Sequence, residues 1–260
     1  LHKEYRRQRQ MCIRDSFKGI HIHYSKNITE LFEYCDMAIT VGGDGTIIHA
    51  AKYAAKADKQ LIGVNVGRLG FAADVEPHEY EQLERLITGD YTTEERILLD
   101  VEVIKEDGSK HYLAVNDAVV ARGQLSKTID LHLTLDGDEI SKYRADGLLF
   151  STPTGSTAYS LSAGGPILAP KMECILMTPV CPHSLFSRSV LFSGESELSV
   201  HVKIPEECCC VLTIDGEKNV PVLATDRVVI RKSDLKLKLA LLHNRNFYKL
   251  LNEKLKERDF

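Results

Sequence analysis

The sequence contains no apolar run near the roughly 20 residues that cross a bilayer, and no charged-then-apolar leader opens it. It also has little excess of either charge, because 33 Lys and Arg stand against 37 Asp and Glu, for a net charge of −4. A general nucleic-acid binder would normally carry a basic excess. We therefore expect a soluble, cytoplasmic protein that binds neither membranes nor nucleic acids.

Paired cysteines are missing as well. The seven cysteines include no CxxC pair, and successive side chains in the run Cys208–Cys210 would point to opposite faces of a strand. Both a disulfide framework and a cysteine-bound metal are therefore disfavoured. We expect the cysteines to be buried, reduced thiols that pack as small apolar side chains.

Two common nucleotide-binding fingerprints are also absent. No Walker lysine follows the glycine-rich segment at residues 42–46, and the chain has no GxGxxG with a downstream acid. With 260 residues, of which 43% are hydrophobic, the chain is long enough for one or two domains with a sizeable core.

The first part of the chain, residues 1–95, alternates strand-like and helix-like segments. The expected strands are Met37–Val41 and Leu61–Asn65, and the expected helices are Ile47–Ala57 and Glu79–Thr88, the second of which is closed by Gly89. This alternation predicts an α/β domain with a doubly wound parallel sheet.

The opening segment, Leu1–Ser16, does not fit this domain. It carries five Lys or Arg and two Asp or Glu, where a buried strand would be expected. It is either a surface helix or a segment foreign to the fold, and we favour the second interpretation.

Residues 96–240 have the pattern of an all-β domain. Strand-like segments are separated by the turn sequences Glu106–Gly108, Asp136–Gly137 and Asp215–Gly216, which suit tight hairpins with positive φ. We expect an antiparallel β-sandwich. Its strands are Ile97–Ile104, His111–Arg122, Ile129–Leu135, Leu148–Thr152, Ile175–Thr178, Leu198–Ile204, Val211–Ile214 and Val228–Ile230. Residues 241–260 end the chain with a helix, Asn246–Glu257, that could return to the first domain.

The segment Gly42–Thr46, with the sequence GGDGT, joins the end of an apolar strand to the start of a helix. Glycines allow the backbone to approach a ligand closely, and the N–H groups of a helix N-terminus suit phosphate. Asp44 must then do something other than bind phosphate, because like charges repel. The alternative is a tight turn in which Asp44 caps the helix.

A second segment, Asp146–Pro166, is rich in hydroxyl groups. A strand leads into a loop with Thr152, Thr154, Ser156 and Thr157, which is followed by a short helix that contains Tyr159. These side chains suit a polar ring or a sugar, with the tyrosine available for stacking. The alternative is a Ser/Thr-rich surface loop.

Together these segments resemble NAD kinase of the bacterial type. The resemblance covers residues 37 to about 240 and is carried by Gly42–Thr46, Val64–Phe71, Val115–Asp117, Asp146–Pro166 and Thr178–Leu185. The long hydroxyl-rich segment is specific. The glycine-aspartate loop is less so, because diacylglycerol-type lipid kinases and phosphofructokinases have a similar one.

The resemblance implies transfer of the γ-phosphoryl group of ATP to the adenosine ribose 2′-hydroxyl of NAD, with Asp44 as the general base. It also implies a divalent metal such as Mg²⁺ and a homodimer or homotetramer. The nucleotide-binding residues that it implies are Gly43, Gly45, Thr46, His49, Asn116, Asp117, Lys127, Arg144, Asp146, Thr154, Thr157, Ala158, Tyr159, Ser160, Leu161 and Ser162. The sequence has no dedicated acidic cluster for a metal, so we expect the substrate phosphates to provide most of the ligands of the metal ion.

The chain departs from the family pattern in three places. Asp117 is one methylene shorter than the usual Glu, Glu217 follows Asp215–Gly216 where Gln often stands, and the opening strand is not recognisable in residues 1–16. Two alternatives to an NAD kinase stay open at this point. One is a lipid kinase of the diacylglycerol class, and the other is a nucleotide-sensing module without turnover, which an intact Asp44 argues against.

Overall fold

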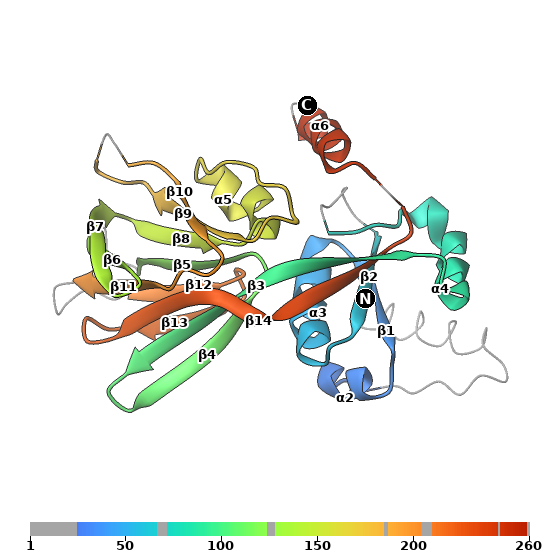
Figure 1. The fold of residues 1–260 in the computed structure, drawn as a ribbon, viewed down its shortest axis with the longest axis horizontal. Helices are drawn as coiled ribbons and strands as arrows, with labels where there is room; N and C mark the ends of the chain where they lie inside the picture. The colour runs from blue at the N-terminus through green and yellow to red at the C-terminus, as the bar shows by residue number, and fades with distance from the viewer. Residues whose placement is uncertain are drawn as a thin grey trace, which may run out of the picture.

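An α/β lobe and an all-β lobe make up the described part of the chain (Figure 1). The computed structural model describes residues 25–66, 72–123, 128–184, 187–203, 210–243 and 245–258. The expected fold class is confirmed. The segment Leu1–Ser16, which we expect to be foreign to the fold, lies outside the described residues. No helix in the described ranges is both long enough and apolar enough to cross a membrane.

The α/β lobe is built around two parallel strands with helices on both faces of the sheet. Strand β1 (Met37–Gly42) pairs in parallel with β2 (Gln60–Asn65), and helix α3 (Asp44–Lys56) connects them. One face packs on α3 and on α2 (Ile28–Glu33), and the other packs on the 3-10 helix η1 (Pro77–Glu84) and on α4 (Arg85–Thr88). The predicted double winding is present.

Two long strands run through both lobes. Strands β3 (Thr92–Lys105) and β14 (Arg227–Leu241) pair antiparallel along most of their length, with a register shift between Lys232 and Lys236. The last part of β14 also pairs in parallel with β2, while its first part pairs with β11. Figure 1 shows this ribbon crossing between the lobes, so both expected domain borders, at residues 95 and 240, fall inside or at the end of the ribbon.

The second lobe is a β-sandwich. The eight-stranded sheet that begins in the α/β lobe packs on a six-stranded antiparallel sheet in the order β10-β9-β8-β5-β12-β13, and side chains from both sheets form one core. The further strands are β4 (Gly108–Ala114), β5 (Asp117–Arg122), β6 (Ile129–Leu135), β7 (Asp138–Ala145), β8 (Gly147–Ser151), β9 (Cys174–Val180), β10 (Val190–Ser193), β11 (Leu198–Lys203), β12 (Cys210–Ile214) and β13 (Lys218–Val222).

Two of the three predicted turns have positive φ at both central residues, whereas in the turn Glu106–Gly108 only Gly108 does, at 128°. Asp136 and Gly137 have φ of 51° and 95°, and Asp215 and Gly216 have φ of 49° and 68°, as a type I′ hairpin requires. The expected single strand His111–Arg122 is wrong, because it is divided into β4 and β5. The backbone between them turns away from pairing, and its N–H groups bond to a carboxylate described below.

The expectation that the cysteines are buried holds only in part. Cys174 and Cys210 are buried, Cys35 is half-buried and Cys181 is exposed. Cys181 follows the buried strand β9 at a φ of 45°, so its side chain leaves the core. Cys12, Cys208 and Cys209 lie outside the described residues.

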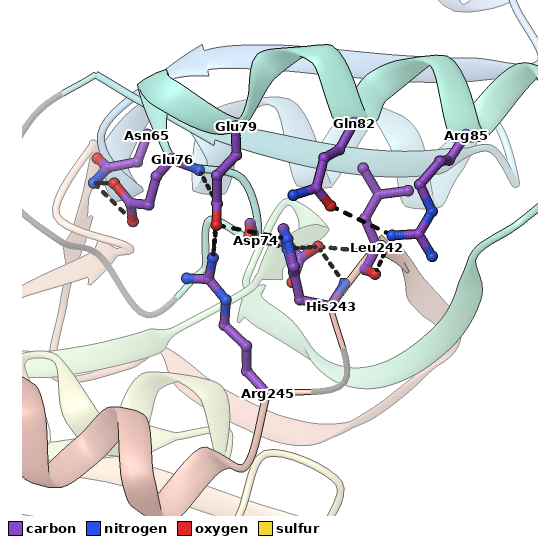
Figure 2. Close-up of polar contacts among 9 residues, drawn as sticks. All are labelled: Asn65, Asp74, Glu76, Glu79, Gln82, Arg85, Leu242, His243 and Arg245. Carbon is purple, nitrogen blue, oxygen red and sulfur yellow. Dashed lines mark hydrogen bonds and ion pairs between the residues drawn. The ribbon is translucent and has the colours of Figure 1, made fainter.

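A polar cluster ties the chain beyond β14 to the α/β lobe (Figure 2). The Asp74 carboxylate accepts hydrogen bonds from the backbone N–H groups of Leu242 and His243, at 2.7 and 3.2 Å. Arg245 pairs with Glu79 of η1 at 2.7 Å. The final helix α6 (Phe247–Arg258) therefore begins against the α/β lobe, where Phe247 lines the cavity described next.

Candidate active site

The glycine-aspartate loop lies at the carboxyl end of β1, the edge at which α/β sheets usually bind ligands. Gly43 is the N-cap of α3 and Asp44 is its first residue, so the alternative in which Asp44 caps the helix is wrong. The Asp44 carboxylate instead accepts a hydrogen bond from the backbone N–H of Ala72, at 3.1 Å. A carboxylate is favoured in this first turn by the helix dipole.

The hydroxyl-rich segment approaches this loop from the other lobe. Strand β8 ends at Ser151, and the chain continues into η2 (Thr154–Thr157) and α5 (Tyr159–Ser162). Gly155 packs directly on the backbone of Asn116, where an added Cβ would lie 2.1 Å from the Asn116 carbonyl oxygen. Thr152 fixes the same contact, because its hydroxyl donates to the Val115 carbonyl at 2.7 Å and accepts from the Gly155 N–H at 3.0 Å.

A cavity of about 160 Å³ lies between these two segments. It brings together five residues predicted from the sequence, namely Asp44, Asn116, Thr154, Thr157 and Ala158. The other lining residues are Ile48, Ala72, Arg96, Pro153, Pro170 and Phe247. A neighbouring cavity of about 420 Å³ shares Ala72, Arg96, Pro170 and Phe247 with it, so the open space extends toward α6.

Arg96 is a lining residue that the sequence analysis missed. Its guanidinium Nε donates to Glu94 at 2.6 Å, and its Nη1 donates to the Thr154 hydroxyl at 3.3 Å. Burial lowers the pKa of Arg96, and the Glu94 carboxylate opposes that shift by favouring the cation. No sequence motif marks this arginine, because it stands at the start of an ordinary amphipathic strand.

Asp117 is buried next to the cavity residue Asn116. Burial and, secondly, the Asp215 carboxylate raise the pKa of Asp117 to about 7, while the Lys52 ammonium group opposes the shift. The carboxyl group therefore changes its charge near neutral pH, which the sequence position alone does not indicate.

We expect Asp117→Asn to change the pH dependence of stability. The folded pKa of about 7 exceeds the ordinary value of 3.8, so this group stabilises the fold below pH 3.8 and loses that contribution as the pH rises to 7. The Asn variant should gain melting temperature relative to the parent between pH 5 and pH 8, measured by thermal unfolding. Asp138→Asn, at an exposed position of β7, is the control. Parallel pH curves for the parent and Asp117→Asn would contradict the prediction.

The remaining predicted residues lie around the cavity or away from it. Ser160 is buried and its hydroxyl bonds to Thr178 at 3.1 Å, whereas the Tyr159 side chain is 47% exposed on α5. The other positions fall into three groups. Arg144 pairs with Asp130, Asp146 with Arg122 and His49 with Glu217. Gly43, Gly45 and Thr46 stand at the start of α3, and Leu161 and Ser162 stand on α5, and none of these five lines the cavity. Lys127 lies outside the described residues.

Acidic ligands for a metal are sparse here. Among the described residues that line the 160 Å³ cavity, Asp44 is the only acidic one. Within the described ranges, no group of three or more His, Cys, Asp or Glu side chains could hold a metal ion.

Two family models match the chain. The ATP-NAD kinase N-terminal domain matches residues 3–91, and the ATP-NAD kinase C-terminal domain matches residues 115–242. The first match includes β1 and the glycine-aspartate loop, and the second includes the hydroxyl-rich segment.

Individual proteins agree with these matches. An NAD kinase of Natranaerobius thermophilus is 41% identical over 225 residues, which are 86% of this chain and 78% of that protein. An NAD kinase of Cellvibrio japonicus is 42% identical over 228 residues, again 86% of this chain, and 76% of that protein.

Two solved structures have a similar fold. Yeast NADH kinase complexed with NADH has a TM-score of 0.79 at 28% identity, covering 91% of this chain and 70% of the other. An NAD kinase from Archaeoglobus fulgidus in complex with ATP has a TM-score of 0.75 at 26% identity, covering 90% and 87%.

Proposed function

This chain belongs to the NAD kinase family, and on that basis we propose that the cavity between its lobes is the site at which ATP phosphorylates NAD, with Asp44 as the general base. The protein is a phosphotransferase that makes NADP from NAD and ATP. The convergence of Asp44 and the hydroxyl-rich segment on one cavity is the observation that carries the site assignment. Neither the lipid-kinase alternative nor the sensing alternative has support among the matched proteins.

In the proposed mechanism, Asp44 accepts the proton of the ribose 2′-hydroxyl as the γ-phosphoryl group is transferred. The Ala72 N–H bond to Oδ1 orients the carboxylate at the start of α3. Phosphoryl transfer depends mainly on positioning and charge neutralisation, and a base adds about 10²- to 10⁴-fold. The glycines beside Asp44 allow the phosphates to approach the start of α3.

The other predicted residues are proposed to hold the nucleotide. Four of them line the cavity, namely Asn116, Thr154, Thr157 and Ala158, and the Thr154 hydroxyl accepts a hydrogen bond from Arg96, which lines the same cavity. Their amide, hydroxyl and apolar groups suit a ribose and a heterocyclic ring better than an acyl chain.

A divalent metal such as Mg²⁺ would find few protein ligands among the residues that line this cavity. Mg²⁺ usually takes one or two carboxylates together with substrate phosphates, and the cavity offers the single carboxylate of Asp44. When bound with ATP, the metal would supply neutralisation of phosphate charge. The phosphates of ATP would provide most of its ligands.

The proposal also includes a cytoplasmic location and a homodimer or homotetramer, which the family resemblance supports.

The exposed Tyr159 ring is compatible with a ligand that is bound at the outer edge of the cavity.

We expect Tyr159→Ala to raise the KM for NAD more than it lowers kcat. Stacking on a nucleotide ring is worth about 0.5–1.5 kcal/mol beyond buried area, and loss of uniform binding appears in KM. Steady-state kinetics against NAD measure both constants. Tyr248→Ala, another exposed tyrosine, is the control. A collapsed kcat at unchanged KM would place Tyr159 at the reacting centre instead.

The function is tested with purified protein, ATP, Mg²⁺ and NAD, with NADP read through an NADP-specific dehydrogenase. We expect NADP to form and diacylglycerol to remain unphosphorylated in a parallel radiolabel assay. Arms with NADH, other nucleoside triphosphates and polyphosphate define the acceptor and the donor. Labelled lipid without NADP would overturn the proposal.

A further inference from the structure

A buried carboxylate organises the backbone next to the cavity. The Asp215 side chain is fully buried at the β12–β13 turn. Its Oδ1 accepts from the N–H groups of Asn116 and Asp117, at 2.7 and 3.0 Å, and its Oδ2 accepts from the N–H of Val115 at 3.0 Å. Three donors therefore converge on one carboxylate and fix the segment that presents Asn116.

The same carboxylate is paired with a cation from the other lobe. The Lys52 ammonium group lies 2.9 Å from Asp215 Oδ2 and 3.1 Å from Glu217 Oε2, and only 16% of its side chain is exposed. Burial lowers the pKa of Lys52, but the two carboxylates outweigh burial and raise it overall. Lys52 thus stays charged, and it stands on α3, the helix that begins with Asp44.

The backbone segment that bonds to Asp215 also bonds to the hydroxyl-rich segment. The backbone that Asp215 holds is in turn held by Thr152, whose hydroxyl bonds to the Val115 carbonyl at 2.7 Å and whose N–H bonds to the Asn116 carbonyl at 2.9 Å. Gly155 packs on the same Asn116 carbonyl. An unbroken polar path therefore joins α3 to the residues that line the cavity.

We propose that Lys52 is a positioning residue, which through Asp215 sets the distance between Asp44 on one lobe and the nucleotide-binding segment on the other. The proposal rests on the roles assigned above to Asp44 and to the cavity. A base must lie within hydrogen-bond reach of the hydroxyl from which it takes the proton. A misplacement of about 1 Å can cost about 100-fold in rate.

The charges around Lys52 indicate which substitution is informative. Asp215, Glu217 and the buried Asp117 face it from the β-lobe, and His49 lies one turn earlier on α3, paired with Glu217 at 3.2 Å. Lys52→Met keeps most of the length of the side chain and removes the cation. Lys52→Arg keeps the cation and can still reach both carboxylates.

The test compares steady-state kinetics and melting temperatures of the parent, Lys52→Met and Lys52→Arg. Lys56→Met is the matched control, because it removes an exposed lysine one turn further along α3. We expect kcat to fall about 10- to 100-fold in Lys52→Met. Lys52→Arg should recover most of that loss, and Lys56→Met should match the parent.

A milder variant keeps the proposal testable if Lys52→Met does not fold. Glu217→Gln removes only the charge of the outer, 40% exposed partner of Lys52 and should lower kcat below that of the parent, with little change in melting temperature. A parental kcat in this variant would count against the positioning role. A parental kcat in folded Lys52→Met, or equal loss in Lys52→Arg, would overturn the positioning role. Near-normal kcat in Asp44→Asn would instead remove Asp44 as the base, and failure of the parent protein to form NADP would overturn the proposed function, so these failures are distinguishable from a failure of the positioning role.

Discussion

Replacing Asp44 with Asn should lower kcat by about 100-fold or more while the protein still binds NAD and ATP. The substitution keeps size and shape, and the amide oxygen of Asn can still accept the Ala72 N–H bond, so the loop should keep its geometry. The proton acceptor is lost. One negative charge beside the phosphates is also lost, so ATP should bind as well as before or slightly better.

The measurement combines kcat from the coupled assay with binding of each nucleotide by calorimetry. Asp36→Asn, an exposed aspartate that precedes β1, makes the same charge change away from the cavity and should leave kcat unaltered. Near-normal kcat in Asp44→Asn would leave the glycine loop as a phosphate cradle only and would require a different base.

Gly155→Ala should be the most damaging single-methyl change in the second lobe. The new Cβ would lie 2.1 Å from the carbonyl oxygen of Asn116 and 2.5 Å from its carbonyl carbon. These are backbone atoms, held on the other side by Asp215 and Thr152, so they cannot move as a flexible side chain would. We expect a loss of about 3 kcal/mol in the free energy of unfolding, together with loss of activity.

Gly45→Ala is the control for that variant. No atom lies within 4 Å of an added Cβ at Gly45, and the position is in the first turn of α3. Alanine is favoured over glycine in helices, so stability should not fall. Chemical denaturation gives both values, and a Gly155→Ala protein as stable as the parent would contradict the close packing of the two segments.

Sequence periodicity was sufficient for the elements that are regular and local. The alternation around β1 and β2 predicted a doubly wound sheet, and the glycine-rich loop was correctly placed at the carboxyl end of a strand. The continuity of β14 was not predicted beyond Val228–Ile230. The register shift between Lys232 and Lys236 interrupts its alternation, and the second half of the strand is recognised as such only through its pairing with β2 and β3.

The polar residues behind the cavity were harder to predict for a physical reason. Asp136–Gly137 and Asp215–Gly216 have the same sequence and the same kind of turn. The Asp136 side chain accepts one exposed backbone N–H, that of Glu197. The Asp215 side chain is buried, accepts the backbone N–H groups of three residues and forms an ion pair with Lys52. That difference arises from which elements the fold brings to each turn, and no local pattern encodes it.

The ribbon of β3 and β14 also constrains the order of events during synthesis. Within the described residues, the last part of β14 lies between β2 and β3 in the sheet of the α/β lobe. That sheet is therefore incomplete until Leu241 has left the ribosome, although β1, α3 and β2 emerge long before. The first lobe cannot reach its native state as an independent unit in the way that consecutive domains commonly do. Nascent chains halted before β14 should expose an unpaired edge of β2, which chaperones would have to protect.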